Sequence, residues 1–156
     1  METPLPSPER KALEVAVTRG CRCSPDPRTC LPRGHCLSRA RIRHLEESEW
    51  VVVTEGSIPM GLAAYKPADS TVRVVFEVLV DRTLAVCDVT RVTDAMLSAL
   101  EIIAHDDQVS SLMFLICGAL AIRPFELRGY TSIVIDPRGI WVEKNLDGVL
   151  CRNSIH

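Results

Sequence analysis

Long apolar segments are missing from this sequence. No run reaches the roughly 18 consecutive apolar residues that a membrane-spanning helix requires. The N-terminal METPLPSPERKALE lacks a basic region followed by an apolar stretch, so we expect no secretory signal. Internal repeats, low-complexity tracts and linkers are missing too. We therefore expect a cytoplasmic protein that does not enter the membrane and forms a single domain over residues 1–156.

A strong excess of basic residues is also missing. The net charge is −2, whereas nucleic-acid-binding domains usually carry a marked positive excess. Residues 1–44 hold nine Arg and Lys against four Asp and Glu, or +5, and residues 45–156 hold nine against sixteen, or −7. Nucleic acid is therefore not an expected partner, although the N-terminal region offers a local basic surface.

The N-terminal region predicts two helices. SPERKALEVAVTRG predicts the first, over residues 7–20. Ser7 can cap its free amides, Pro8 suits its first position, and Gly20 suits its left-handed stop. LSRARIRHLEESE, residues 37–49, predicts a second, polar helix, although its basic start and acidic end oppose the helix dipole.

The rest of the chain predicts a sheet with two further helices. β-branched or apolar runs bounded by turn residues predict strands, and apolar residues spaced by three and four predict helix faces. The predicted strands are 50–54, 60–66, 71–80, 109–117 and a closing hairpin of YTSIVI and IWVEKNL; the predicted helices are 89–103 and 119–129. We expect an α/β fold with a mixed, mostly antiparallel sheet of about six strands and about four helices. The expected parts are 7–49 (helices and a Cys-rich loop), 50–146 (sheet and cleft) and 147–156 (tail).

This order of elements resembles that of the GNAT-superfamily N-acetyltransferases. The closest local match is ALAIRPFELRGYTSIVIDPRGIWVEKNL, which is similar to the family's N-x-x-A-x-x-x-Y-x-x-x-G-F segment and its closing hairpin. Ala121, Gly129 and Tyr130 are in register with that segment. The resemblance covers most of residues 7–146 and implies a GNAT-like fold.

The resemblance also implies a place for acetyl-CoA. In the family, the fourth and fifth strands splay apart, and the freed strand backbone binds the pantetheine arm of the cofactor. The corresponding strands here are residues 71–80 and 109–117. The cofactor is therefore expected along Val78, Leu79 and Val80.

The family's pyrophosphate loop has the pattern R/Q-x-x-G-x-G/A, and this chain departs from it. The glycines are needed because phosphate oxygens approach the backbone where a β-carbon would intrude. Alignment through AMLSALE puts the three positions on Asp88, Arg91 and Thr93, in a stretch without glycine. One interpretation is that side chains hold the phosphate instead; the alternative is a plain helix N-terminus capped by Asp88 or Thr90. The phosphate-binding residues expected under the first interpretation are Arg82, Thr90, Arg91, Val92 and Thr93.

Glu77 is the candidate catalytic residue. The resemblance puts Phe125 where many members have a proton-donating Tyr, and Gly118 where many have Asn. A carboxylate on the central strand can instead take a proton from the acceptor amine. Strand alternation groups Arg73, Val75, Glu77 and Leu79 on one face, so Glu77 is either this base or a surface residue paired with Arg73. Tyr130 is expected to pack in the core.

CRCSPDPRTCLPRGHC brings four cysteines into sixteen residues, namely Cys21, Cys23, Cys30 and Cys36. Four thiolates on a bent loop can surround a tetrahedral Zn²⁺. The usual spacing is C-x-x-C, however, and the first pair here is C-x-C. The sequence leaves open a zinc site or a loop of free thiols that pack as small hydrophobic groups.

The resemblance, and the departures of this chain from the family pattern, leave two functions open. The first is an N-acyltransferase that moves an acetyl or acyl group from acyl-CoA to an amine, either on a small molecule or on a protein N-terminus or lysine. The resemblance also implies a homodimer through the last strands. The second is a catalytically degenerate GNAT-fold interaction domain, with the Cys-rich loop as a partner or zinc site.

Overall fold

A computed structural model describes residues 12–18, 26–67, 69–117 and 122–146, and the structural statements below concern these residues. The elements are β1 (Leu13–Thr18), η1 (Pro27–Cys30), α1 (Arg39–Glu46), β2 (Glu49–Glu55), β3 (Ile58–Pro67), β4 (Val72–Val80), α2 (Val86–Asp106), β5 (Ser111–Ile116), α3 (Arg123–Leu127), β6 (Thr131–Asp136) and β7 (Gly139–Asn145). None of the helices in these ranges is long and apolar enough to cross a membrane.

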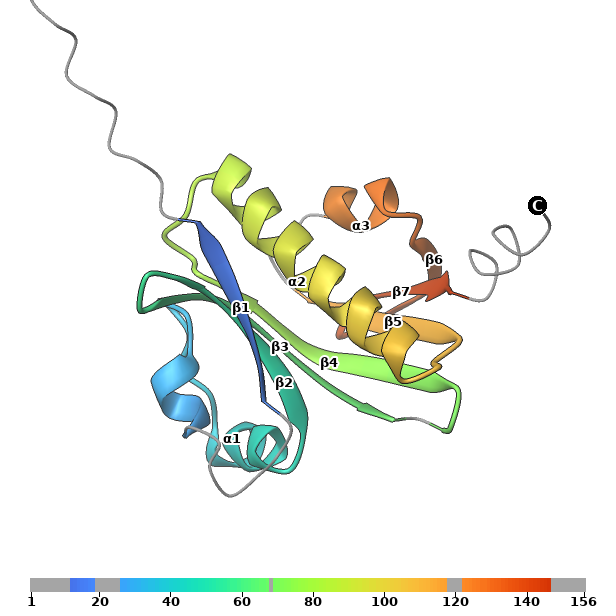
Figure 1. Cartoon of the computed structure of the whole chain (residues 1–156), viewed down its shortest axis with the longest axis horizontal. Helices are drawn as coiled ribbons and strands as arrows, with labels where there is room; N and C mark the ends of the chain where they lie inside the picture. Colours follow the sequence, from blue (N-terminus) through green and yellow to red (C-terminus); the bar gives the residue numbers. More distant parts are fainter. Residues whose placement is uncertain (1–11, 19–25, 68, 118–121, 147–156) are drawn as a thin grey trace, which may run out of the picture.

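The strands form one seven-stranded sheet in the order β1-β2-β3-β4-β5-β7-β6. Every neighbouring pair is antiparallel except β4 and β5, which run parallel. A parallel pair needs a long crossover, and α2 supplies it between β4 and β5. Figure 1 shows α2 lying across one face of the sheet, with α1 on the other side of β2 and β3. The predicted mixed, mostly antiparallel sheet is confirmed, with seven strands and three α-helices in the described part.

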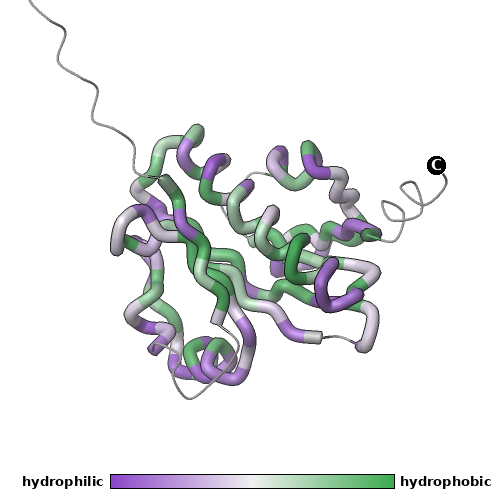
Figure 2. The backbone as a smooth tube through the Cα atoms, in the orientation of Figure 1, coloured by the Kyte–Doolittle hydropathy of each residue, from purple (hydrophilic) through white to green (hydrophobic). Residues whose placement is uncertain are grey.

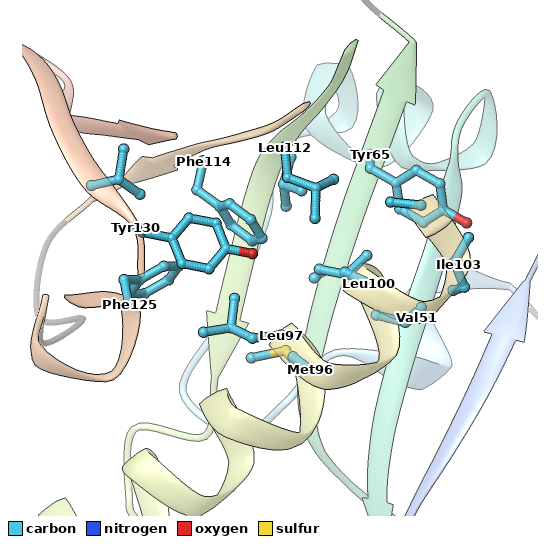
Figure 3. Packing of buried hydrophobic residues seen from close by; sticks show 14 of the residues in the cluster. Val51, Tyr65, Met96, Leu97, Leu100, Ile103, Leu112, Phe114, Phe125 and Tyr130 are labelled. Carbon is cyan, nitrogen blue, oxygen red and sulfur yellow. The ribbon is translucent and has the colours of Figure 1, made fainter. Parts of the chain in front are cut away.

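A hydrophobic core fills each face of the sheet. On the first, α2 buries apolar residues spaced by three and four against β2, β3 and β5, which is why this segment forms a helix that packs on a sheet. Figure 3 shows four of them, namely Met96, Leu97, Leu100 and Ile103. On the second face, α1 packs Ile42 and Leu45 against Trp50, Leu62 and Leu79. The tube in Figure 2 shows hydrophobic residues concentrated along the strands.

The helix predicted over residues 7–20 is wrong where the structure describes it, because Leu13–Thr18 is strand β1. Val15 pairs with Val53 and Val17 with Val51 in an antiparallel register. β-Branched residues favour this extended conformation, and the strand covers the backbone groups that β2 would otherwise expose at the sheet edge. The capping residues that predicted the helix lie outside the described residues.

Three aromatic side chains join the last elements to the sheet. Phe114 of β5 makes edge-to-face contacts with Phe125 of α3 and with Tyr130, each with ring centroids 5.3 Å apart (Figure 3). Phe125 is fully buried, so the residue at the family's Tyr position is part of the core. Tyr130 is a core residue, as predicted; burial, with a smaller effect of Glu101, raises the pKa of its phenol.

Candidate functional site

A cleft opens where β4 and β5 separate. The two strands pair only from Val72 with Ser111 to Val75 with Phe114, although β4 continues to Val80 and β5 to Ile116. The cleft beyond the last pair has a volume of about 980 Å³. Its walls are residues 76–82 at the end of β4, residues 34–37, the start of α2 and the end of β5. The splayed strand pair that the family resemblance implies is therefore present.

The wall formed by β4 presents backbone hydrogen-bonding groups to the cleft. The amide of Asp81 donates to the carbonyl of Met60 in β3 over 2.9 Å. Successive residues of a strand point their backbone groups to opposite edges, so those of Val78 and Val80 point away from β3. Within the described ranges, no strand pairs with β4 on that edge beyond Val75. This edge can bind an extended ligand that carries amide groups.

Residues 33–36, here called the strap, lie against the end of this edge. The ring Nε2 of His35 donates to the carbonyl oxygen of Val80 over 2.8 Å. The amide of Arg82 donates to the carbonyl of Arg33 over 3.1 Å. Gly34 has φ of +86°, and a Cβ there would lie 2.9 Å from the Cβ of Arg82. Glycine thus allows the strap to pack closely on the end of β4.

The buried carboxylate of Asp81 fixes the strap to this end of the strand. One oxygen accepts from Arg33 Nε at 2.9 Å, and the other accepts from the amide of Thr83 at 2.8 Å and its hydroxyl at 2.6 Å. Burial opposes ionisation of Asp81, but the hydrogen bonds from Thr83 and Arg33 outweigh it and hold its pKa below the ordinary 3.8. Asp81 is therefore a structural anion, with both oxygens engaged.

Asp81→Asn is expected to destabilise the protein at pH 7 by about 1–3 kcal/mol, because a buried charged hydrogen-bond network loses one partner. A folded-state pKa below the ordinary value stabilises the fold above that value, and the stabilisation is lost as the pH falls through the folded pKa. The difference in free energy of unfolding between variant and wild type should therefore become smaller in acid. Urea unfolding at pH 7 and about pH 3 measures it, with the exposed Asp106→Asn as the neutral control. A gap of equal size at both pH values would contradict this account.

Glu77 lies on the face of the sheet that carries α1. Ala64 of β3 pairs with Glu77, but the next residue, Tyr65, pairs with Val75, so Phe76 is the extra residue of a β-bulge. Val75 packs with α2, whereas Leu79 and Phe76 pack with α1. The sequence-based grouping of Val75 and Glu77 on one face is therefore wrong, because simple alternation cannot register the extra residue.

Arg41 of α1 is the partner of Glu77. Its Nε donates to Oε1 over 2.6 Å and its Nη2 donates to Oε2 over 2.7 Å. The Glu77 side chain is 13% exposed and that of Arg41 is 49% exposed, and both line the cleft. The hydrogen bond that Arg41 donates to Glu77 raises the pKa of Arg41, against the effect of its partial burial. The alternative partner Arg73 instead lies 3.9 Å from Asp107.

Sequence reasoning missed Arg41, which is 36 positions from Glu77. One signal pointed toward such a partner. The first turn of α1 contains no acidic residue, and an arginine there opposes the helix dipole. A cation that is locally unfavourable at a helix start is a reason to look for a tertiary anion.

The start of α2 lies closer to the cleft than the aligned glycine positions do. The helix begins at Val86, and no side chain caps its first amides. Arg82 lines the cleft, and Thr90 is exposed one turn into the helix, where its hydroxyl donates to the carbonyl of Val86. The structure therefore brings Arg82 and the first turn of α2 to the cleft.

The other expected phosphate-binding residues are directed elsewhere. Arg91 lies 3.8 Å from Glu55 of β2. Val92 and Thr93 are each 1% exposed and pack in the core. A Cβ at Gly61 of β3 would lie 2.7 Å from Val92, which shows how closely α2 approaches the sheet there. The structure does not bring the side chains of Val92 and Thr93 to the cleft.

Two thiols line the cleft, Cys36 at the end of the strap and Cys117 just after β5. Burial, together with the nearby Glu77 carboxylate, raises the pKa of the Cys117 thiol. Cys30 is a half-buried free thiol outside the cleft. Cys21 and Cys23 of the predicted zinc site lie outside the described residues, and the described ones contain no cluster of three or more His, Cys, Asp or Glu suited to a metal.

The arrangement of the strands and helices is found in solved acetyltransferases. Ard1 from Thermoplasma volcanium superposes with a TM-score of 0.65 at 12% identity, covering 84% of this chain and 97% of that one. PaiA N-acetyltransferase from Thermoplasma acidophilum, in complex with coenzyme A, gives 0.62 at 10% identity, over 86% and 99%. A GNAT family acetyltransferase from Elizabethkingia anophelis with acetyl-CoA bound gives 0.61 at 11% identity, over 85% and 98%.

Comparison by sequence gives no match. No protein-family model matches the chain, and no curated protein matches it significantly. The structural likeness therefore shows the fold, and the chain has the fold of the GNAT-family acetyltransferases.

Proposed function

We propose that this chain, with its GNAT fold, is an N-acyltransferase that moves an acetyl or acyl group from acyl-CoA to an amine. The observation that carries the proposal is the splay of β4 from β5 beyond Val75, which leaves strand backbone facing a cleft of about 980 Å³. Two solved structures of the same fold hold coenzyme A or acetyl-CoA. Such a likeness supports the choice of donor.

The residues around the cleft fit the chemical groups of acyl-CoA. The backbone groups of Val78 and Val80 suit the amides of the pantetheine arm, because a strand edge binds amides as a neighbouring strand does. Arg82 and the uncapped first turn of α2 suit the phosphates, since free amides and a cation both favour an anion. Acyl-CoA supplies an activated acyl group as a thioester.

Glu77 is the group that can accept a proton from the acceptor amine. Each of its carboxylate oxygens accepts one hydrogen bond from Arg41 and keeps a further lone pair for a second donor. The bidentate contact fixes the carboxylate at the cleft wall. Arg41 therefore acts as a positioning residue, and Glu77 acts as the general base.

Titration with acetyl-CoA tests the donor. A ligand at 100 times its dissociation constant adds about 2.7 kcal/mol to the free energy of unfolding, which appears as a rise in Tm. At that concentration, alkylation of Cys117 and Cys36 by iodoacetamide should slow at least about tenfold, because occupied protein is protected. Cys30, outside the cleft, is the internal control in the same peptide map. Unchanged Tm and unchanged alkylation at millimolar acetyl-CoA would remove the acyltransferase proposal.

A second candidate function is a GNAT-fold interaction domain without catalysis. The observation that favours it is the hydrogen bond from His35 to Val80, because the strap already occupies one backbone carbonyl of the cleft edge. The same titration separates the two candidates, since an interaction domain of this kind binds no acetyl-CoA. Zinc bound by Cys21, Cys23, Cys30 and Cys36 stays a prediction attached to this second function.

A homodimer through the last strands and a cytoplasmic location belong to the same proposal. β6 is the outermost strand beside β7, and its apolar side chains are exposed. Ile133 is 45% exposed, Val134 53% and Ile135 79%. An exposed apolar edge strand favours pairing with a second copy, which supports the dimer.

A further inference from the structure

The charges that line the cleft balance. Two cations, Arg41 and Arg82, stand against two carboxylates, Glu77 and Asp81. Asp81 is buried and has both oxygens engaged, so it has no role in binding a cationic ligand. A cleft without a net negative charge does not attract a polycation such as a polyamine or a lysine-rich tail. The acceptor that suits it has little net charge.

The Arg41–Glu77 pair places one positive and one negative group side by side at the cleft wall. A guanidinium has five N–H donors. Arg41 donates two of them, from Nε and Nη2, to the Glu77 carboxylate. The remaining donors include both hydrogens of Nη1, on a side chain that is 49% exposed. Glu77 keeps unused lone pairs beside them. A cation with spare donors therefore lies next to an anion with spare acceptors, at the wall of the cleft.

From this juxtaposition we infer that the acceptor is a free α-amino acid, bound as a zwitterion across Arg41 and Glu77. Its carboxylate accepts from the outer edge of the Arg41 guanidinium, and its ammonium group donates to Glu77. Planar, bidentate recognition of a carboxylate is what arginine does best. The inference rests on the proposed acyltransferase function and names its substrate class.

The zwitterion also positions the nitrogen for reaction. The ammonium group gives one proton to Glu77, and the freed lone pair of the nitrogen forms the bond to the acyl carbon. The carbon–sulfur bond breaks, and the departing sulfur takes the second proton from the nitrogen. The products are an N-acyl amino acid and free coenzyme A, and Glu77 returns its proton to water.

The amino-acid side chain has apolar surroundings. Leu37, Phe76 and Leu79 line the cleft on the α1 side of β4, beside the Arg41–Glu77 pair. Phe76 stacks on His44 with ring centroids 4.2 Å apart, which holds this wall in place. An apolar side chain is therefore expected to be preferred over a charged one.

The experiment compares each amino acid with its own methyl ester. Each of the twenty standard amino acids and its α-methyl ester is supplied singly with acetyl-CoA to the full chain, and release of free coenzyme A gives kcat/KM. We expect at least about tenfold higher kcat/KM for the acid of the preferred pair, because only the acid has a carboxylate for Arg41. Arg41→Gln should lower the acid-to-ester ratio at least about tenfold from its wild-type value. Arg43→Gln, on the same helix but outside the cleft lining, should keep it.

The ratio within one variant cancels any loss of Glu77 positioning that Arg41→Gln causes. Spermidine and a lysine-containing peptide are run beside the amino acids. The inference is overturned if esters, spermidine or the peptide react as fast as the acids, or if acetyl-CoA binds while no amino acid is acylated. Failure of the proposed function is a different result, because acetyl-CoA then neither raises Tm nor protects Cys117.

Discussion

Glu77→Gln is expected to lower kcat by roughly 10²–10⁴, the usual contribution of a general base. The amide keeps the size of the carboxylate and loses its capacity to take a proton. The dissociation constant for acetyl-CoA should stay within about twofold, since a group that acts on the acceptor contributes little to donor binding. The loss should be largest at low pH, where more of the acceptor amine carries the proton that Glu77 removes. Steady-state kinetics across pH and a binding titration measure the two effects.

The matched control is Glu101→Gln. Glu101 has the same 13% side-chain exposure and is also held by an arginine, with Arg128 Nε 2.7 Å from Oε2. It accepts from Lys144 as well, and it lies outside the cleft between β4 and β5. We expect activity within about twofold of wild type for this control, because it removes a buried ion pair of similar kind without touching the site. Equal rates for Glu77→Gln and wild type at every pH would remove the catalytic role.

Phe114→Ala is expected to cost about 3–5 kcal/mol in free energy of unfolding, the usual range for a large buried aromatic side chain. Phe114 is 1% exposed and touches both Phe125 and Tyr130. Its backbone also forms the last pair with Val75 before the strands separate. Urea denaturation measures the loss, with Ile102→Ala at an exposed position of α2 as the surface control, expected within about 0.5 kcal/mol of wild type. A loss below about 1 kcal/mol would show that the aromatic cluster does not anchor α3.

The regular elements could be predicted from the sequence because their patterns are local. The spacing of Val92, Met96 and Leu100 predicted α2, and the apolar run after Val109 predicted β5. β1 was mistaken for a helix because the cap-like residues around it suggested a helix, whereas the partner that makes it a strand is β2. The start of α2 was also placed too late, since the apolar face begins at Val89 but the helix begins at Val86.

The cleft was predicted by the resemblance, but the contacts inside it could not be. The bulge at Phe76 adds one residue, and only the register with β3 reveals it. Glu77 therefore has a different face and a different partner from those that alternation gave it. Arg41 and His35 reach β4 from 36 and 45 positions away in the chain, and no periodic pattern records contacts over such a distance.

His35 of the strap already bonds the Val80 carbonyl, so it competes with any ligand for this part of the cleft edge. A ligand that needs the lone pair of the Val80 carbonyl to which His35 donates must first replace that imidazole, which stays tethered to the chain. A hydrogen bond of this kind contributes about 0.5–1.5 kcal/mol, so the tethered imidazole weakens the observed affinity of such a ligand roughly 2- to 13-fold. The affinity of such a ligand is therefore set partly by residues that the ligand need never touch. A substitution at Gly34 or Arg33 would change how tightly the strap packs on β4, and would thereby change the dissociation constant of a ligand bound at this edge.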